Sequence, residues 1–541
     1  MKKILSLFLA ASLSSFAIDA ESVVPELPAE FTDGFFIQNE GWYGKAKGSI
    51  NWVASDGTLF YNVDGKANGN AEVLGNTAQF GKIYGANYYV TSKQQPRFVV
   101  LDAKSLVRKA TFDVLGSEDD NVGDGRDVCP VGNGKVYVGA SMGIEVYDEA
   151  TGAFVKSIEG TSTYEVGTII RVGKYVFATE QNTGVLVIDP STDAIVKRIE
   201  NADITALVVS KDGNLWADAG DNLIRINPVT LEAESTFQMT NSLISAYTYP
   251  AKICASLTEN ALFYLYGSSW SANKIGKLLI DEDGNVSEDT NFSFTMPTME
   301  DKYTPDFYGA PGFDPISGNL VVTTCNSYSI NNWVHFVDPA TGAVVKTIKL
   351  LSDDGKGTYW FMSTPVFPDN KLPEIELGDI ALSGEEIAKY PVADFVSDAD
   401  NLAALSIVEK AEIDDAEVAT VDYDGMNIIV TPVGNGTANL SLSVNSNGKT
   451  AAKTVSVNVS GLSSVRENVV SGVDAYVSGG VLYVTGASEG VATVYNMMGA
   501  VVASAQLSGA TAVDLSGVPA GTYIVKIRTA NGEKSLKVAK F

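Results

Sequence analysis

Short stretches of alternating apolar and polar residues repeat through the first two thirds of the chain, and each repeat contains the same predicted hairpin. The hairpin has a strand, an Asp/Asn-x-x-Thr/Ser turn and a second strand, as in EVYDEATGAFVKSI at 145–158. Asp or Asn can hydrogen-bond to the backbone two residues further on, and Pro at the next position presets φ, so this sequence suits a tight turn. Further copies lie at 99–112, 186–199, 224–237 and 335–348, with looser copies at 51–63 and 278–292.

The spacing of these hairpins predicts the fold. Their turn residues, from Asp56 to Asp338, are separated by 46, 46, 41, 38, 54 and 57 residues. Units of this size with short alternating strands and no convincing amphipathic helix are typical of four-stranded propeller blades. We therefore predict an all-β chain with a seven-bladed β-propeller over residues 33–369. Residues 34–63 supply only three strands of the first blade, so we expect the aromatic segment 357–369 to add the fourth and close the ring.

The loops between the second and third strands of the blades form the candidate site. In a propeller these loops share one face, and the first of them is NEGWYG at 39–44. Rigid aromatic rings with adaptable amides suit an uncharged, partly planar ligand such as a glycan or a tetrapyrrole-like cofactor. The alternative for each Trp and Tyr is packing between blades. The candidate ligand-binding residues are Asn39, Glu40, Trp42, Tyr43, Gln94, Arg97, Gln181, Asn182, Trp270, Tyr328, Asn332 and Trp333. We expect Trp42, Tyr43, Trp270 and Trp333 to line one shared pocket.

The V-x-D-P-x-T-x-x-x-V-x-x-I hairpins resemble those of the YVTN/YncE-like β-propeller superfamily. The stretch from GFFIQNEG to YWFMSTPVFPD resembles a Bacteroidetes branch of that superfamily, which includes secreted proteins and surface propellers that capture cobalamin. The resemblance covers about residues 33–369 and implies a corrinoid as a candidate ligand on the loop-rich face. The chain differs from the capture proteins because it lacks a Cys near the predicted cleavage site that could carry a lipid anchor.

Two small β-sandwich modules are expected after the propeller. Residues 373–460 are about the size of one β-sandwich and resemble Ig-like or cadherin-like spacers of surface proteins. Their acidic loop with Asp394, Asp398 and Asp400 is interpreted as solvated turn carboxylates, with a calcium site as the alternative. Residues 470–541 resemble the C-terminal sorting domain of type IX (Por) secretion, through VYNMMGAVV, VDLSGVPAGTYIVKI and KSLKVAKF. The resemblance implies recognition by that secretion machinery.

The N-terminal sequence indicates where the protein is located, and the net charge limits which partners it can bind. Residues 1–20 have two lysines, an apolar run and small residues, as in a secretory signal peptide. No later apolar run approaches the length of a membrane helix. The formal charge of −27 opposes nucleic acid as a partner. We expect a protein that is secreted or displayed at the cell surface, with no membrane span.

Few residues in the sequence are candidates for catalysis or metal binding. His335, the single histidine, lies in an alternating run typical of a strand interior, and Cys129, Cys254 and Cys325 are widely spaced, which is typical of buried thiols. The densest acidic run, 117–127, lies in one loop, whereas a channel metal needs ligands from several blades. We therefore predict no catalytic residue, no metal and no cofactor. The expected function is binding of a small-molecule or glycan ligand, and the alternative is a surface scaffold or adhesion protein that contacts another protein.

Overall fold

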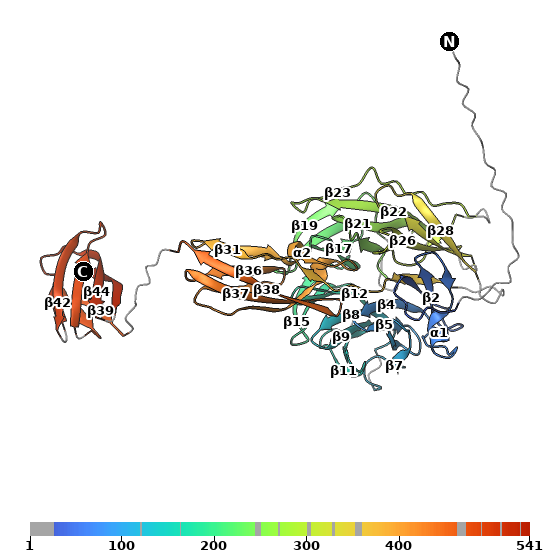
Figure 1. The fold of residues 1–541 in the computed structure, drawn as a ribbon, viewed down its shortest axis with the longest axis horizontal. Helices are drawn as coiled ribbons and strands as arrows, with labels where there is room; N and C mark the ends of the chain where they lie inside the picture. Colours follow the sequence, from blue (N-terminus) through green and yellow to red (C-terminus); the bar gives the residue numbers. More distant parts are fainter. Residues whose placement is uncertain are drawn as a thin grey trace, which may run out of the picture. The chain divides into compact units, whose positions relative to one another are not determined.

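The computed structural model describes residues 26–119, 122–162, 164–243, 250–268, 271–299, 304–326, 331–351, 360–462, 472–487, 489–508, 511–530 and 532–541 (Figure 1). The predicted signal peptide, residues 1–20, lies outside them. The chain divides into two compact units, Met1–Val433 with Thr437–Asn458, and Gly434–Gly436 with Val459–Phe541. Strands dominate both units, so the all-β prediction is confirmed.

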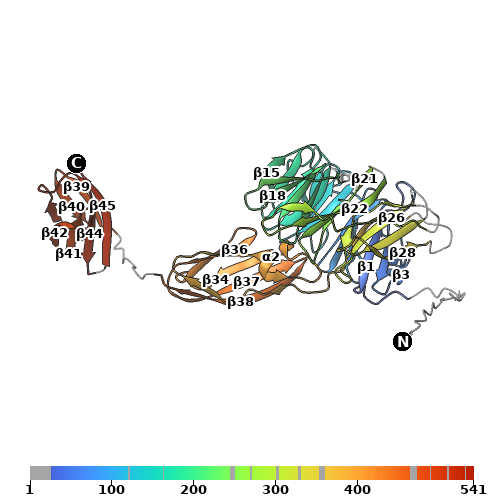
Figure 2. The same ribbon diagram turned by 90° about the horizontal axis from the view of Figure 1, so that it is seen from above.

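Antiparallel sheets built from neighbouring strands follow one another through the first unit (Figures 1 and 2). The first sheet has the order β29-β1-β2-β3, with β1 (Gly34–Asn39), β2 (Ser49–Ala54), β3 (Leu59–Phe60) and β29 (Met362–Val366). The next two contain β4 (Ala78–Tyr84), β5 (Asn87–Ser92), β6 (Phe98–Asp102) and β7 (Arg108–Phe112), then β8 (Gly125–Gly132), β9 (Lys135–Ala140), β10 (Gly143–Asp148) and β11 (Phe154–Ser157).

Four more sheets complete this part of the chain. Two of them contain β12 (Val166–Val172), β13 (Tyr175–Glu180), β14 (Gly184–Asp189) and β15 (Ala194–Glu200), then β16 (Ala206–Val209), β17 (Leu215–Ala219), β18 (Asn222–Asn227) and β19 (Glu232–Gln238). The other two contain β20 (Ile253–Ala255), β21 (Ala261–Ser268), β22 (Ser271–Ile280) and β23 (Val286–Glu288), then β24 (Asp306–Phe307), β25 (Gly312–Phe313), β26 (Leu320–Cys325), β27 (Asn332–Val337) and β28 (Val344–Leu350).

The ring closes where the sequence predicts. β29 pairs antiparallel with β1, with Phe36 opposite Val366 and Gln38 opposite Thr364. Each neighbouring pair of sheets shares a hydrophobic cluster, and one cluster joins the last sheet to the first through Phe35, Phe336 and Met362. Because every sheet is packed on both sides, the architecture is that of a β-propeller.

The first sheet departs from the predicted strand pattern at its third strand. β3 has only two residues, and the chain then forms a short helix, α1 (Val63–Ala67), beside β2 (Figure 1). Asn62 precedes α1 with a left-handed backbone, φ 49°. A helix of five residues has no repeating apolar stripe, so the hydrophobic pattern did not indicate it.

Residues 374–460 form further sheets that pack against the propeller. One contains β31 (Ile380–Ser383), β34 (Ile407–Ile413), β37 (Gly436–Ser446) and β38 (Lys449–Ser460), and another contains β32 (Ala388–Pro391), β35 (Ala419–Tyr423) and β36 (Asn427–Pro432). A short pair, β30 (Glu374–Ile375) and β33 (Val396–Ser397), the helix α2 (Val392–Phe395) and the 3-10 helix η1 (Ala403–Leu405) complete this module.

The C-terminal unit has its own core. Its sheets are β39-β40-β43 and β42-β41-β44-β45, and Leu482, Val494 and Val525 lie in the apolar cluster of this unit. The strands are β39 (Asp474–Ser478), β40 (Val481–Thr485), β41 (Glu489–Tyr495), β42 (Val501–Ser508), β43 (Thr511–Asp514), β44 (Gly521–Thr529) and β45 (Gly532–Lys540).

Candidate functional site

The propeller has two different faces. Connections within an antiparallel sheet leave from opposite ends of the strands in turn. We call the side with the loops after β1, β5, β9 and β13 the loop face, and the side with the turns after β4, β8 and β12 the turn face. Side chains and backbone groups of successive loops bond to each other on the loop face, as between Gly44 and Gln94.

The module of residues 374–460 covers the turn face. The backbone N–H of Gly85, in the turn after β4, donates to the carbonyl of Asn447 at 2.8 Å. Gly173, in the turn after β12, lies so close to Gly425 that a Cβ would sit 1.9 Å from the Gly425 carbonyl oxygen. Ala404 packs into the cluster between the sheets of β12–β15 and β16–β19. The contacts of this module therefore fall on the face opposite the predicted site.

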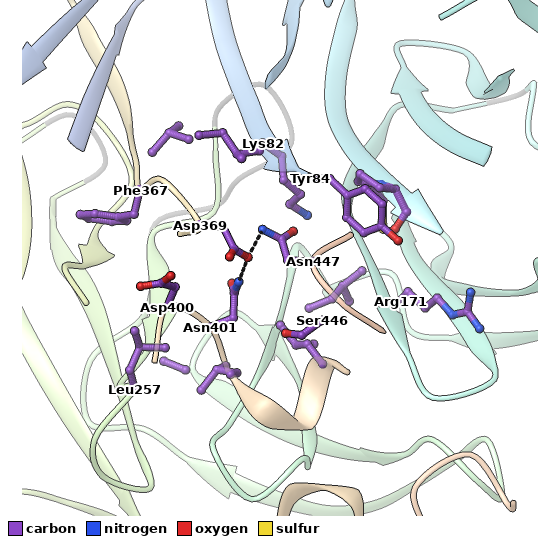
Figure 3. A pocket seen from close by; sticks show the side chains of 18 of the residues that line it. Lys82, Tyr84, Arg171, Leu257, Phe367, Asp369, Asp400, Asn401, Ser446 and Asn447 are labelled. Carbon is purple, nitrogen blue, oxygen red and sulfur yellow. Dashed lines mark hydrogen bonds between the residues drawn. The ribbon is translucent and has the colours of Figure 1, made fainter. Parts of the chain in front are cut away.

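A pocket of about 340 Å³ lies where the module meets the turn face (Figure 3). The Asp369 carboxylate there accepts hydrogen bonds from the side chains of Asn401 (2.6 Å) and Asn447 (2.9 Å) and pairs with the Lys449 ammonium at 2.6 Å. Lys82 extends into the same pocket from β4 (Figure 3). Burial raises the pKa of Asp369, while Lys449 and Asn447 oppose that rise. This polar contact ties the module to the propeller.

The predicted loop at 39–44 forms a hydrogen-bonded hairpin on the loop face. The N–H of Trp42 donates to Ala46 O at 3.0 Å, and the N–H of Ala46 donates to Trp42 O at 2.9 Å. The Gly44 N–H donates to Gln94 Oε1 at 2.7 Å, which joins two predicted site loops directly. Tyr43 at the tip is 60% exposed.

Glu40 lies behind this hairpin as a buried carboxylate. It accepts hydrogen bonds from Gln79 Nε2 at 2.7 Å and from the Tyr308 hydroxyl at 3.0 Å. Burial raises the pKa of Glu40, and the Gln79 hydrogen bond and the charges of Lys93 and Lys252 oppose the rise. Burial lowers the pKa of Lys252 to about 8, and its ammonium donates to the Tyr308 carbonyl. Groups of both charges thus influence one another beside the loop that follows β1.

A line of polar contacts continues from Arg97 around the loop face. Arg97 Nη1 lies 3.4 Å from Asp124 Oδ1, and the buried Arg126 pairs with Glu165 at 2.6 Å. The N–H of Gln181 donates to the Glu165 carbonyl at 2.9 Å. The predicted residues Gln94, Arg97 and Gln181 therefore belong to one set of neighbouring loops. Sequence reasoning did not single out Arg126, because it lies within a strand.

Trp333 does not contribute to the shared aromatic pocket that the sequence predicts. The ring of Trp42 meets that of Phe361 edge-on at 6.1 Å between centroids, and Lys45 Nζ lies 3.8 Å from the Trp42 ring centroid. Trp333 is only 1% exposed, so its ring packs in the interior and is not available to a shared pocket. The alternative of packing between blades holds for this residue, because β27 is a buried central strand.

The remaining predicted residues have separate positions. Asn39 and Asn332 are buried at the ends of β1 and β27, and the exposed Asn182 takes a left-handed conformation, φ 62°, in the turn after β13. Trp270 and Tyr328 lie outside the described residues. Tyr164 and Met142 are 42% and 48% exposed on neighbouring loops of the loop face, a feature that the sequence did not reveal.

A pocket of about 460 Å³ lies beside the same hairpin, and we call it the α1 pocket. Asn39, Lys45, Asp64, Lys66 and Glu72 line it together with parts of the backbone. Asp64 is 2% exposed and its Oδ1 accepts a 2.8 Å hydrogen bond from the N–H of Ile50. Burial raises the pKa of Asp64 to about 6, although backbone hydrogen bonds oppose the rise.

His335 and Asp400 each take part in hydrogen bonds within the fold. His335 is buried, and its ring nitrogens lie 2.8 Å from Thr324 Oγ1 and 2.9 Å from Thr347 Oγ1. Asp400 Oδ2 accepts hydrogen bonds from the N–H groups of Asn370 and Lys371, both at 2.6 Å. Within the described ranges, no three His, Cys, Asp or Glu residues are grouped as metal ligands. The three cysteines are free thiols.

Comparison with known family models identifies the family to which the chain belongs. The model described as Domain of unknown function (DUF5074) matches residues 33–368, more than half of the sequence. The chain belongs to this family. A second model, Secretion system C-terminal sorting domain, matches residues 479–540. A search of curated proteins finds no match.

Several solved structures are similar. A quinonprotein alcohol dehydrogenase-like protein from Bacteroides thetaiotaomicron VPI-5482 is 17% identical, with 62% of this chain and 79% of that chain covered and a TM-score of 0.44. The extracellular domain of a candidate one component system from B. thetaiotaomicron is 11% identical, with coverages of 76% and 61% and a TM-score of 0.35. The RRP9 WD40 repeats are 11% identical, with coverages of 50% and 80% and a TM-score of 0.38.

The sorting domain settles the location. Its match at residues 479–540 indicates export by type IX secretion, through contact with that machinery, to the cell surface or the medium. The helices among the described residues are all too short to cross a membrane. The prediction of a secreted or surface protein is confirmed.

Proposed function

We propose that this DUF5074 protein is an exported seven-bladed β-propeller that binds a ligand on its loop face and does not perform catalysis. The observation that carries the proposal is the difference between the faces. The Ig-like or cadherin-like module of residues 373–460 packs on the turn face, while loops of several sheets bring buried charges and exposed side chains together on the loop face. Concave sites with a few fixed polar groups are typical of ligand binding.

The ligand class follows from the side chains on that face. Tyr43 offers an exposed aromatic ring, and Gln94 and Arg97 lie on the adjoining loop. Aromatic rings and hydrogen-bonding groups together suit a glycan or a corrinoid better than a purely apolar molecule.

The test uses the mature full-length protein. Cobalamin, haem and a glycan panel are each added, and the melting temperature and tryptophan fluorescence are recorded. A ligand that binds only the native state raises the melting temperature as its concentration exceeds Kd. Tyr43→Ser should reduce the response, whereas Tyr476→Ser, on an exposed tyrosine of the C-terminal unit, should not. An unchanged response of the Tyr43 variant places the ligand elsewhere.

A scaffold or adhesion role is the second candidate. Met142 and Tyr164 are exposed apolar side chains on the loop face, and such residues are common in protein interfaces. If no compound of the panel changes the melting temperature, this role becomes the favoured one.

A further inference from the structure

The α1 pocket has walls that are fixed by hydrogen bonds. Asp64 holds the start of α1 to β2 through the Ile50 N–H, and the Asn68 side chain donates to the carbonyls of Asp64 (2.7 Å) and Leu106 (2.9 Å). On the other side, the hairpin of Trp42 is held by Gln94 through Gly44. A pocket with such walls exists before a ligand arrives, which lowers the entropy cost of binding.

Two of the residues that line this pocket carry buried hydrogen-bond acceptors. Asn39 is 1% exposed, and its Oδ1 has no hydrogen-bond partner among the described residues, whereas its Nδ2 donates to Ser49 Oγ at 3.3 Å. Asp64 lines the same pocket as a second buried acceptor. A buried acceptor without a partner is costly, so a hydroxyl or N–H group supplied from outside would stabilise it.

Cationic side chains lie at the rim. Lys45 is exposed, with its ammonium over the Trp42 ring, and Lys66 makes no ion pair with any residue that the structure describes. Lys47 also lines the pocket, but its ammonium donates to the carbonyl of Gln95 at 2.5 Å. Glu72 is the one exposed carboxylate among the described lining residues. Ammonium groups gathered at one rim are notable in a chain with a net charge of −27.

We propose that the α1 pocket binds one sugar unit of an acidic saccharide, with its hydroxyls on Asn39 Oδ1 and Asp64 and its carboxylate on Lys45 and Lys66. This inference rests on the proposed ligand-binding function and specifies its substrate class as a uronate-containing glycan. The volume of about 460 Å³ lies within the range of small-ligand pockets. The arrangement of acceptors inside and ammonium groups outside matches a molecule with hydroxyls at one end and an anionic group at the other.

The test compares three oligosaccharides on the mature full-length protein by calorimetry: a trigalacturonate, the neutral galactotriose and a sulfated galactotriose. We expect the trigalacturonate to bind at least about tenfold more tightly than the neutral trisaccharide, since charge-assisted hydrogen bonds are the stronger ones. The preference should shrink as salt is raised. Equal affinity for acidic and neutral sugars overturns the proposal, and a preference for the sulfated sugar overturns the assignment to a carboxylate.

Matched lysine variants locate the site. Lys66→Met and Lys45→Met should each lower trigalacturonate affinity about five- to tenfold and leave galactotriose binding unchanged, whereas Lys211→Met, at an exposed lysine of the turn face, should change neither. Melting curves confirm that each variant folds. If trigalacturonate binds and neither lysine variant changes its affinity, the assignment of the site to the α1 pocket is overturned, but the proposed binding function stands. If all saccharides fail while cobalamin or haem binds, only this inference is overturned; if every compound fails, both are.

Discussion

The hydroxyl of Tyr308 donates a 3.0 Å hydrogen bond to the buried carboxylate of Glu40, across 268 positions of the sequence. The bond connects the last sheet of the ring to the end of β1. Tyr308→Phe removes the donor while Gln79 still bonds to the carboxylate. We expect the free energy of unfolding to fall by about 1.5–3 kcal/mol, the usual range for a hydrogen bond to a charged group. Urea unfolding of the natural protein and the variant at pH 7 measures this fall in the free energy of unfolding.

Tyr43→Phe is the matched control for this variant, because the Tyr43 side chain is 60% exposed and should tolerate loss of the hydroxyl without a change in midpoint. An unchanged midpoint for Tyr308→Phe as well would show that the bond contributes nothing to the stability of the ring.

The ion pair between Lys449 and Asp369 should stabilise the contact between the module of residues 374–460 and the turn face. Lys449→Met leaves the Asp369 carboxylate, whose side chain is 2% exposed, with only Asn401 and Asn447. Loss of one partner of a buried pair costs about 3–5 kcal/mol, and the remaining amides place this variant at the lower end. Chemical unfolding and limited proteolysis of residues 370–460 report the loss.

An exposed pair supplies the control for this ion pair. Lys410→Met breaks the contact with Glu412, in which both side chains are about half or more exposed, and should change stability by less than about 1 kcal/mol. Asp369→Asn added to Lys449→Met should restore part of the loss, since no charge then remains unpaired. Failure of that double variant to recover would indicate that packing of the lysine stem is the larger effect.

His335 makes stability depend on pH in the acid range. Burial lowers the pKa of His335 to about 4, whereas the unfolded chain has the usual value of 6.5. The unfolded state therefore binds the proton first, and the stabilisation present above pH 6.5 is lost as the pH falls toward 4, by about 3 kcal/mol. The difference in unfolding free energy between the natural protein and His335→Gln should shrink by that amount over this range. A pH-independent difference would contradict it.

Asp64 has the opposite dependence. Its pKa is raised to about 6, so the native state binds the proton more readily than the unfolded state between about pH 4 and 6. Stability attributable to this group falls as the pH rises through that window, by up to about 3 kcal/mol. Asp64→Asn keeps an acceptor for the Ile50 N–H and removes the titration, so it should gain stability relative to the natural protein as the pH rises to 7. If the difference in unfolding free energy between Asp64→Asn and the natural protein stays constant from pH 4 to 7, the raised pKa of Asp64 is contradicted.

Removal of residues 463–541 tests the route of export. The sorting domain matched at 479–540 is lost, while the compact unit before it keeps its own core. We expect the shortened chain to stay in the cell envelope, with none on the surface or in the medium, as measured by cell fractionation and surface labelling. Lys410→Met in the full chain serves as the control and should be exported normally. Surface display of the shortened chain would show that another segment directs export.

The sequence by itself determined the strand-rich architecture, the strand that completes the first sheet and the sorting domain. These features depend on local chemistry: Asp148 and its counterparts form their turns with neighbouring residues, and alternating apolar positions define strands wherever they occur. The mid-strand position expected for His335 follows from the same alternation.

Only the tertiary structure decided which face remains for a ligand and which side chains meet there. Gly173 and Gly425 come together because the module docks on the turn face, and Glu40 finds Tyr308 because the ring closes. The same packing buries Trp333, which the sequence presents as equivalent to Tyr43. Such contacts join residues far apart in the chain, so they depend on the relative placement of whole sheets and have no signature in the local pattern.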